Sequence, residues 1–302
     1  LCRLASEDSR VVGITAAMPD GTGLSSFCTS HCERFFDVGI AEPHGLTFAA
    51  GLALEGMRPC FAVYSSFMQR ALDQLIHDVC LPNLPVTIAL DRSGVVGADG
   101  PTHHGVFDLA YLRYVPNLTV MVPKDENELR HMLYTAVNLG SPAALRYPRG
   151  SGEGVALDED LHLLPTGQGE VLREGSDLLL LPIGNRVYPA LEAAELLAEK
   201  GVHAAVINPR FLKPLDASLI CSWASRTGAV LTIEDGCILG GFGSAVVQLL
   251  QEQGLCLPVR SLGYGDAFID QGPQRVLWQQ AGIDSAGIVR SALALLQGHI
   301  SQ

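Results

Sequence analysis

The chain has 302 residues and a net charge of −12, and 48% of its residues are hydrophobic while 17% are charged. This length predicts two domains with a core each, and the composition excludes a disordered chain. The acidic balance argues against a nucleic-acid partner, and no apolar run approaches the roughly 20 residues of a membrane-spanning helix, so we expect neither nucleic acid nor membrane as a partner.

Apolar strands alternate with helical segments through the first half of the chain. This alternation is typical of a parallel α/β fold. Strands are expected at 10–17, 34–40, 58–64, 85–90, 118–122 and 143–147. Helices are expected at 43–54, 67–80 and 126–138, with Pro43 in the first helical position of its helix. The first half therefore predicts a mainly parallel sheet flanked by helices.

A stretch rich in glycine and acidic residues interrupts this rhythm around 150–169 and is predicted to be a linker. A second α/β pattern follows it. Strands are expected at 177–182, 203–207 and 229–234, and helices at 188–200, 216–225, 243–253, 273–280 and 285–296. We therefore predict one domain at 1–150, a linker at 151–168 and a second, mainly parallel domain at 169–302.

Eight cysteines are present, but they form no Cys-x-x-Cys pair and no spacing typical of a zinc site. Reduced thiols are usual in the cytoplasm. We therefore predict a cytoplasmic protein, and we predict no metal ligand in this chain.

The segment 91–105 combines glycines, aspartates, an arginine and two adjacent histidines after a buried strand. Ligands of open α/β sheets bind beyond the carboxyl ends of the strands, so we expect chemistry here. Neighbouring residues rarely bind one ion together, so His103 or His104 is better suited to proton transfer. Arg92 can bind a substrate anion or pair with Asp99, and the residues alone leave both open.

Other candidates also follow strands. Glu42 stands where a helix begins, which favours its anion, while an apolar pocket would favour its protonated form. It can therefore exchange a proton with a ring nitrogen, or simply cap the helix. Tyr64, Phe67 and Arg70 follow the neighbouring strand and are expected near Glu42, and Phe67 can stack on a flat ring or pack in the core. Arg149 suits an anion site or a surface position.

The second half of the chain gives weaker signals. Its glycine-rich segment 239–243 lacks the Gly-x-Gly-x-x-Gly pattern, so a tight turn is predicted there. The segment 208–214 is predicted to be a structural connection. We predict no catalytic residue in this domain.

Several segments taken together resemble 1-deoxy-D-xylulose-5-phosphate synthases, a transketolase-like family that uses thiamine diphosphate. They are 14–18, 36–42, 64–70, 91–105, 146–150, 208–216, 234–243 and 268–272. The resemblance implies a transketolase-like pyrimidine-binding domain followed by a transketolase C-terminal domain. The family's remaining domain carries Gly-Asp-Gly and binds the diphosphate and magnesium, and this chain contains no Gly-Asp-Gly. The resemblance thus covers only part of such an enzyme.

For the cofactor, the resemblance implies that Glu42 hydrogen-bonds the aminopyrimidine ring of thiamine diphosphate. It implies that Phe67 packs on that ring and that Arg70 lies beside it. Mg²⁺ would be bound by the missing domain. Pro43 departs from the family, which usually has glutamine after this glutamate, and this puts the fine tuning of Glu42 in doubt.

For the substrates, the resemblance implies that Arg92 and Arg149 clamp the phosphate of glyceraldehyde 3-phosphate. Tyr64, Asp99 and His103 would line the acceptor site, with His103 as a catalytic proton donor. The implied reaction condenses pyruvate with this aldehyde and releases CO₂, in isoprenoid and thiamine biosynthesis. The implied assembly is a homodimer.

Without the missing domain, we expect this chain to be inactive alone. It would be a truncated piece, a proteolytic fragment or one subunit of a split enzyme, and the initial Leu1 favours the first two. Two alternatives are a split transketolase and the beta-type subunit of a 2-oxo-acid dehydrogenase. The segment 91–105 and Arg149 argue against both. A third is a non-catalytic scaffold, in which Glu42→Ala would leave the rate unchanged.

Overall fold

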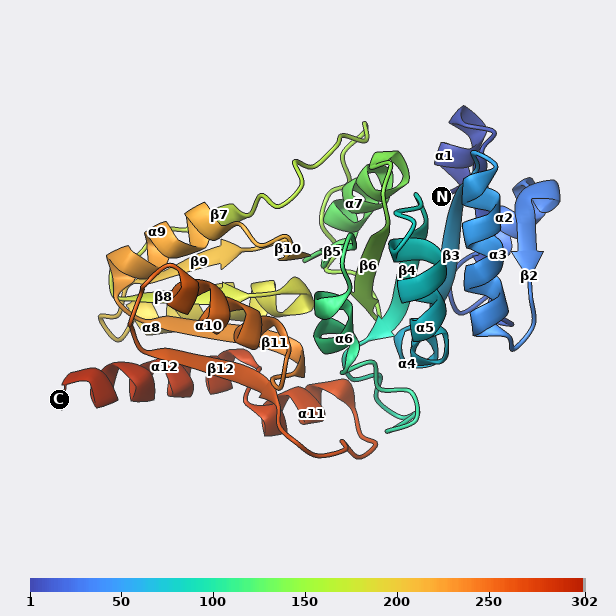
Figure 1. Ribbon diagram of the computed structural model, residues 1–302. Helices are drawn as coiled ribbons and strands as arrows, with labels where there is room; N and C mark the ends of the chain where they lie inside the picture. Colours follow the sequence, from blue (N-terminus) through green and yellow to red (C-terminus); the bar gives the residue numbers. More distant parts are fainter. Residues whose placement is uncertain (301–302) are drawn as a thin grey trace.

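The computed structural model describes residues 1–300, which form two sheets side by side, each covered by helices (Figure 1). The first sheet has seven strands in the order β10-β5-β6-β4-β3-β1-β2, and the second has five in the order β12-β11-β8-β9-β7. All neighbouring strands are parallel except the edge pairs β10–β5 and β7–β9. The prediction of two mainly parallel sheets flanked by helices is confirmed.

The central strands are buried along their whole length, which explains their continuous apolar sequence. The first sheet contains β1 (Val11–Thr15), β2 (Phe35–Asp37), β3 (Arg58–Tyr64), β4 (Thr87–Ser93), β5 (Thr119–Met121), β6 (Ala143–Pro148) and β10 (Phe211–Lys213). The second contains β7 (Glu170–Arg173), β8 (Leu178–Pro182), β9 (Ala204–Asn208), β11 (Val230–Cys237) and β12 (Val259–Tyr264). The sequence did not predict β7, β10 or β12, because these edge strands are short or only partly buried and lack a long apolar run.

Helices cover the faces of both sheets (Figure 1). In the first half they are α1 (Cys2–Glu7), α2 (Ser25–Ser30), α3 (Glu42–Leu54), α4 (Ser65–Met68), α5 (Leu72–Gln74), α6 (Asp108–Tyr114) and α7 (Glu126–Asn138). In the second half they are α8 (Val187–Ala198), α9 (Ala217–Thr227), α10 (Phe242–Glu252), α11 (Gln274–Ala281) and α12 (Ser285–Ile300). No helix in residues 1–300 is both long and apolar enough to cross a membrane.

The single helix predicted at 67–80 is wrong. The chain instead forms α4, a 3₁₀ turn at Gln69–Ala71, α5 and a π-helical segment at Leu75–Cys80. Changes of helix type of this kind are frequent at functional sites. Here the break carries Arg70, whose guanidinium pairs with Glu42 of α3. Helix α3 itself begins at Glu42, one residue before the predicted start.

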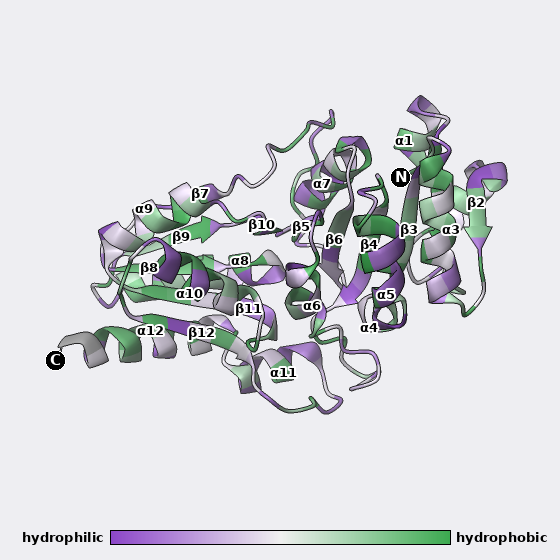
Figure 2. Cartoon of the chain, viewed as in Figure 1, coloured by the Kyte–Doolittle hydropathy of each residue, from purple (hydrophilic) through white to green (hydrophobic). Residues whose placement is uncertain are grey.

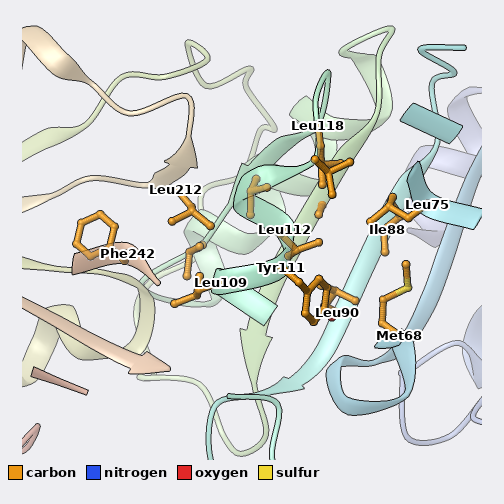
Figure 3. Packing of buried hydrophobic residues seen from close by; sticks show 14 of the residues in the cluster. Met68, Leu75, Ile88, Leu90, Leu109, Tyr111, Leu112, Leu118, Leu212 and Phe242 are labelled. Atoms are coloured by element: carbon orange, nitrogen blue, oxygen red, sulfur yellow. The ribbon is translucent and has the colours of Figure 1, made fainter. Parts of the chain in front are cut away.

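One hydrophobic cluster runs through both halves of the molecule. Figure 3 shows Met68 and Ile88 at one end, Leu109 in the middle, and Leu212 and Phe242 at the other end. Figure 2 colours the chain by hydropathy. Inner strands such as β9 are apolar, whereas short outer helices such as α5 carry polar residues. Because the two sheets share this core, the second domain packs directly against the first.

A buried carboxylate adds a polar bond between the halves. Asp235 at the end of β11 accepts hydrogen bonds from Asn185 Nδ2 (2.9 Å), Tyr264 Oη (3.0 Å) and Trp278 Nε1 (3.1 Å). It also accepts from the backbone N–H of Val95 in the first domain (3.2 Å). A buried charge with this many donors is satisfied, so Asp235 can stabilise the contact between the domains.

The residue before it, Glu234, titrates in the neutral range. Its carboxylate is buried and accepts from the backbone N–H groups of Phe242 (2.9 Å) and Gly243 (2.8 Å) at the start of α10. Burial raises its pKa from 4.5 to about 7 despite these bonds. A folded-state pKa above the unfolded value means that the folded chain holds an extra proton between these pH values. This contribution to stability is therefore complete below pH 4.5 and is lost as the pH rises through about 7.

We expect Glu234→Gln to remove this pH dependence. The unfolding free energy of the wild type, minus that of the variant, should fall by up to about 3 kcal/mol between pH 4.5 and 8. Urea unfolding at a series of pH values measures this difference. A difference that stays constant or rises with pH would contradict the raised pKa of Glu234.

Candidate active site

The sequence-predicted site residues meet at the carboxyl edge of the first sheet. Tyr64 ends β3, Arg92 lies near the end of β4, and Arg149 directly follows β6. Strand β3 pairs with β4, and β4 pairs with β6, all in parallel, so these three ends lie next to one another. Residues far apart in the chain are thereby placed at one edge.

Glu42 forms the inner end of the site. It is only 2% exposed, although it opens helix α3. Its Oε1 accepts a hydrogen bond from Arg70, and no other described residue donates to this carboxylate, so Oε2 stays available to a ligand. The Arg70 guanidinium lies 4.7 Å from the centroid of the Phe67 ring. A buried carboxylate thus stands near an aromatic side chain, as an aromatic ligand with an N–H donor requires.

Two arginines form the outer end. Arg92 Nη1 lies 2.9 Å and Arg149 Nη1 lies 3.4 Å from the same atom, Asp99 Oδ2. The Arg92 guanidinium also stacks 3.9 Å from the centroid of the Tyr64 ring, which is 5.6 Å from the Phe67 ring. The pairing of Arg92 with Asp99 is therefore present, and it holds both guanidinium groups in one place where an anion could bind bidentately.

The adjacent histidines separate into different roles. His103 faces the site: its ring and the Phe67 ring meet edge to face, with their centroids 5.2 Å apart. His104 is buried, and its Nδ1 accepts from Val96 N (3.0 Å). The proton must then lie on Nε2, which donates to the carbonyl of Asp270 (3.3 Å). His104 therefore holds the backbone. His103 shares a hydrogen bond with Thr102 Oγ1 through its Nδ1 (2.9 Å), and its Nε2 has no partner among the described residues.

The backbone around Arg92 is strained. Its φ of +58° is left-handed, which is costly for a residue with a side chain. The register of β4 against β6 shifts between Leu90 and Ser93, as in a β-bulge, and bulges redirect side chains. Paired 2.8 Å bonds between Gly94 and Gly105 then close the loop at its base. The chain thus keeps an unfavourable conformation that aims Arg92 into the site.

A cavity of about 350 Å³ opens beside the arginines. Arg92 and Arg149 line it together with Asp91, Lys124 and Tyr147. Burial raises the pKa of Asp91 to about 6, although both guanidinium groups oppose this rise. The sequence analysis assigned no role to Asp91 or Lys124. Asp91 stood inside the segment 91–105, but Lys124 had no local signal.

A buried hydrogen-bond network of Ser65, Asp108 and Arg146 lies next to the site. Ser65 Oγ donates to Asp108 Oδ2 (2.8 Å), and Arg146 Nε donates to Asp108 Oδ1 (2.8 Å). Arg146 also donates to the backbone carbonyl of Asp235 at the other domain. The sequence analysis missed Asp108 because it begins α6, a helix that was not predicted.

One cluster of metal-type ligands lies away from this site. Among the described residues, the only such group of three is His131, Asp158 and His162, where α7 meets the linker. His131 Nδ1 accepts from the backbone N–H of His162 (3.2 Å), so Nε2 carries the proton and donates to Asp158 Oδ2 (2.8 Å). These bonds fasten the linker to α7. Two histidines and one carboxylate also differ from the oxygen ligands that Mg²⁺ prefers.

Comparison with known proteins gives matches along the chain. Residues 1–153 match the transketolase pyrimidine-binding domain, and residues 167–288 match the transketolase C-terminal domain. The chain is 59% identical over 297 residues to 1-deoxy-D-xylulose-5-phosphate synthase 1 of Geobacter metallireducens, covering 98% of this chain and 48% of that protein. It is 58% identical over 301 residues to the synthase of Desulfotalea psychrophila, covering 98% of this chain and 47% of that protein. The chain thus spans about half the length of the curated relatives it matches.

A solved structure is similar over almost its full length. It is described as "Split gene transketolase, inactive beta4 tetramer", with a TM-score of 0.87 and 33% sequence identity. The match covers 98% of this chain and 95% of that one.

Proposed function

This chain belongs to the transketolase family, and on that premise we propose that it forms the aminopyrimidine-binding and C-terminal part of a 1-deoxy-D-xylulose-5-phosphate synthase. The assembled enzyme would condense pyruvate with glyceraldehyde 3-phosphate and release CO₂, as a cytoplasmic homodimer in isoprenoid and thiamine biosynthesis. The observation that carries this proposal is the pair Arg92 and Arg149 converging on Asp99 at the same sheet edge as the buried Glu42.

The inner end of the site fits the aminopyrimidine of thiamine diphosphate. When bound, this cofactor supplies a thiazolium ring that takes up the electron pair left as CO₂ departs from pyruvate. Glu42 Oε2 would accept a hydrogen bond from the pyrimidine ring, and Arg70 would orient the carboxylate through its bond to Oε1. Phe67 would pack on the ring. For Mg²⁺, we propose ligands in the other half of the enzyme, because residues 1–300 contain no cluster of oxygen ligands of the type it prefers.

The outer end fits the acceptor aldehyde. Arg92 and Arg149 would bind its phosphate through paired N–H donors. Asp99 would hold the two guanidinium groups together before the substrate arrives. His103 would donate a proton to the aldehyde oxygen as the new carbon–carbon bond forms, since its ring lies beside the Phe67 ring.

Reconstitution tests the proposal. We expect no product from the purified chain alone, because we propose that the cofactor diphosphate binds to the other half of the enzyme. We expect deoxyxylulose phosphate after addition of a polypeptide that carries the diphosphate-binding domain, measured by product analysis with pyruvate, glyceraldehyde 3-phosphate, thiamine diphosphate and Mg²⁺.

The added polypeptide alone serves as the control. Product formed by this chain without it would refute the proposed division of the site. A preference for a ketose donor or for a lipoyl acceptor would point instead to a split transketolase or a 2-oxo-acid dehydrogenase subunit.

A further inference from the structure

One side chain of the C-terminal domain bonds to the backbone of both segments that carry the arginines. Gln274, the first residue of α11, donates through Nε2 to the carbonyl of Val95 (2.7 Å) and to the carbonyl of Arg149 (3.2 Å). Val95 lies three residues after Arg92 in the same loop. One amide group therefore bridges the two segments that carry the arginines, and both of its hydrogens are used.

The loop that contains Gly97 also packs closely against the residues around Gln274. Gly97 has a φ of +93°, and a Cβ atom there would lie 3.6 Å from Gln274 Cγ and 3.4 Å from the carbonyl oxygen of Gly272. The backbone N–H of Val95 is bound by Asp235, so the C-terminal domain holds Val95 at both its N–H and its carbonyl. The second domain thus adds to the bonds that fix this loop from the first domain, among them the bond from Arg149 Nη1 to the carbonyl of Val96 (2.9 Å).

We propose that Gln274 is a positioning residue that sets the spacing of Arg92 and Arg149 and thereby the affinity of the site for the acceptor's phosphate. The inference rests on the proposed function for the identity of that acceptor. It assigns the C-terminal domain a part in substrate recognition. Gln274 bonds to backbone carbonyls in both segments, so the role assigned to it is to position the arginines rather than to take part in the reaction.

The amide is suited to this role because carbonyl oxygens only accept hydrogen bonds, and its two N–H groups reach both. Methionine has almost the same length but no donor. Losing both hydrogen bonds, which water replaces only in part, would weaken phosphate binding about tenfold. Lysine at this position would restore donors to both carbonyls.

The first measurement is calorimetric titration of the 302-residue chain with inorganic phosphate. We expect Gln274→Met to raise the dissociation constant about tenfold and Gln274→Lys to recover most of the loss. Gln280→Met, an exposed change on the same helix, is the control and should bind as the wild type does. Gln274→Ala replaces the methionine variant if the latter does not fold. Equal phosphate affinity in the wild type and a folded donor-free variant would overturn the proposal.

The second measurement uses the reconstituted enzyme. Gln274→Met should raise KM for glyceraldehyde 3-phosphate about tenfold without changing KM for pyruvate. With unphosphorylated glyceraldehyde as acceptor, kcat/KM should stay at the wild-type value. An equal loss with both acceptors would mean a merely structural role and would refute the inference. A wild-type enzyme that makes no deoxyxylulose phosphate would refute the proposed function instead, and the phosphate titration would still decide the role of Gln274.

Discussion

Glu42→Gln is expected to lower kcat of the reconstituted enzyme by at least 10²-fold, the range of a lost proton-transfer group. Glutamine keeps the size of the side chain but carries no charge, so it cannot hold a proton donated by the pyrimidine ring. It also leaves Arg70 without its ionic partner. The measurement is steady-state turnover at saturating pyruvate, glyceraldehyde 3-phosphate and thiamine diphosphate.

The matched control is Glu55→Gln, an exposed carboxylate directly after the same helix. It should retain wild-type turnover, and both variants should keep the wild-type circular dichroism spectrum. A folded Glu42→Gln enzyme with unchanged turnover would contradict the proposed role. It would favour the hypothesis that this chain is a scaffold without a catalytic function.

Much of the candidate site could be predicted from local sequence. Glu42, Tyr64, Arg92 and Arg149 stand at or next to a strand end or a helix start. In a parallel sheet, all such positions lie at one edge, so strand order is not needed to bring them together. Arg92 and Arg149 are distant in sequence, yet both contact Asp99. The roles assigned to these residues stay predictions until the variants are measured.

The supporting residues could not be predicted in this way. Asp235 and Gln274 belong to the second domain and act on the first only through tertiary contacts. Strand β10 likewise follows the linker in sequence but joins the edge of the first sheet. Nothing in the local pattern of 208–214 indicates a partner strand from the other half of the chain. The sequence indicates which groups are candidates for chemistry, and the packing between the domains shows what holds them in place.

Arg146→Met is expected to destabilise the chain by about 3–5 kcal/mol, the usual cost of leaving one charge of a buried pair without its partner. Arg146 is 3% exposed and Asp108 is fully buried, and their Nε and Oδ1 atoms are 2.8 Å apart. The variant would leave the Asp108 carboxylate with the Ser65 hydroxyl as its side-chain donor. It would also remove a donor to the Asp235 carbonyl across the domain contact. Equilibrium unfolding in urea measures the loss.

A second substitution separates charge from packing. If the unpaired carboxylate causes the loss, Asp108→Asn combined with Arg146→Met should recover part of the stability, because asparagine keeps a hydrogen-bonding oxygen without the charge. Arg260→Met, at an exposed position of β12, is the control and should change stability little. A double variant less stable than Arg146→Met would mean that lost packing of the guanidinium stem, rather than buried charge, dominates. The Arg146–Asp108 pair would then stabilise the contact between the domains mainly by filling space, and its hydrogen bonds to Ser65 and Asp235 would contribute little.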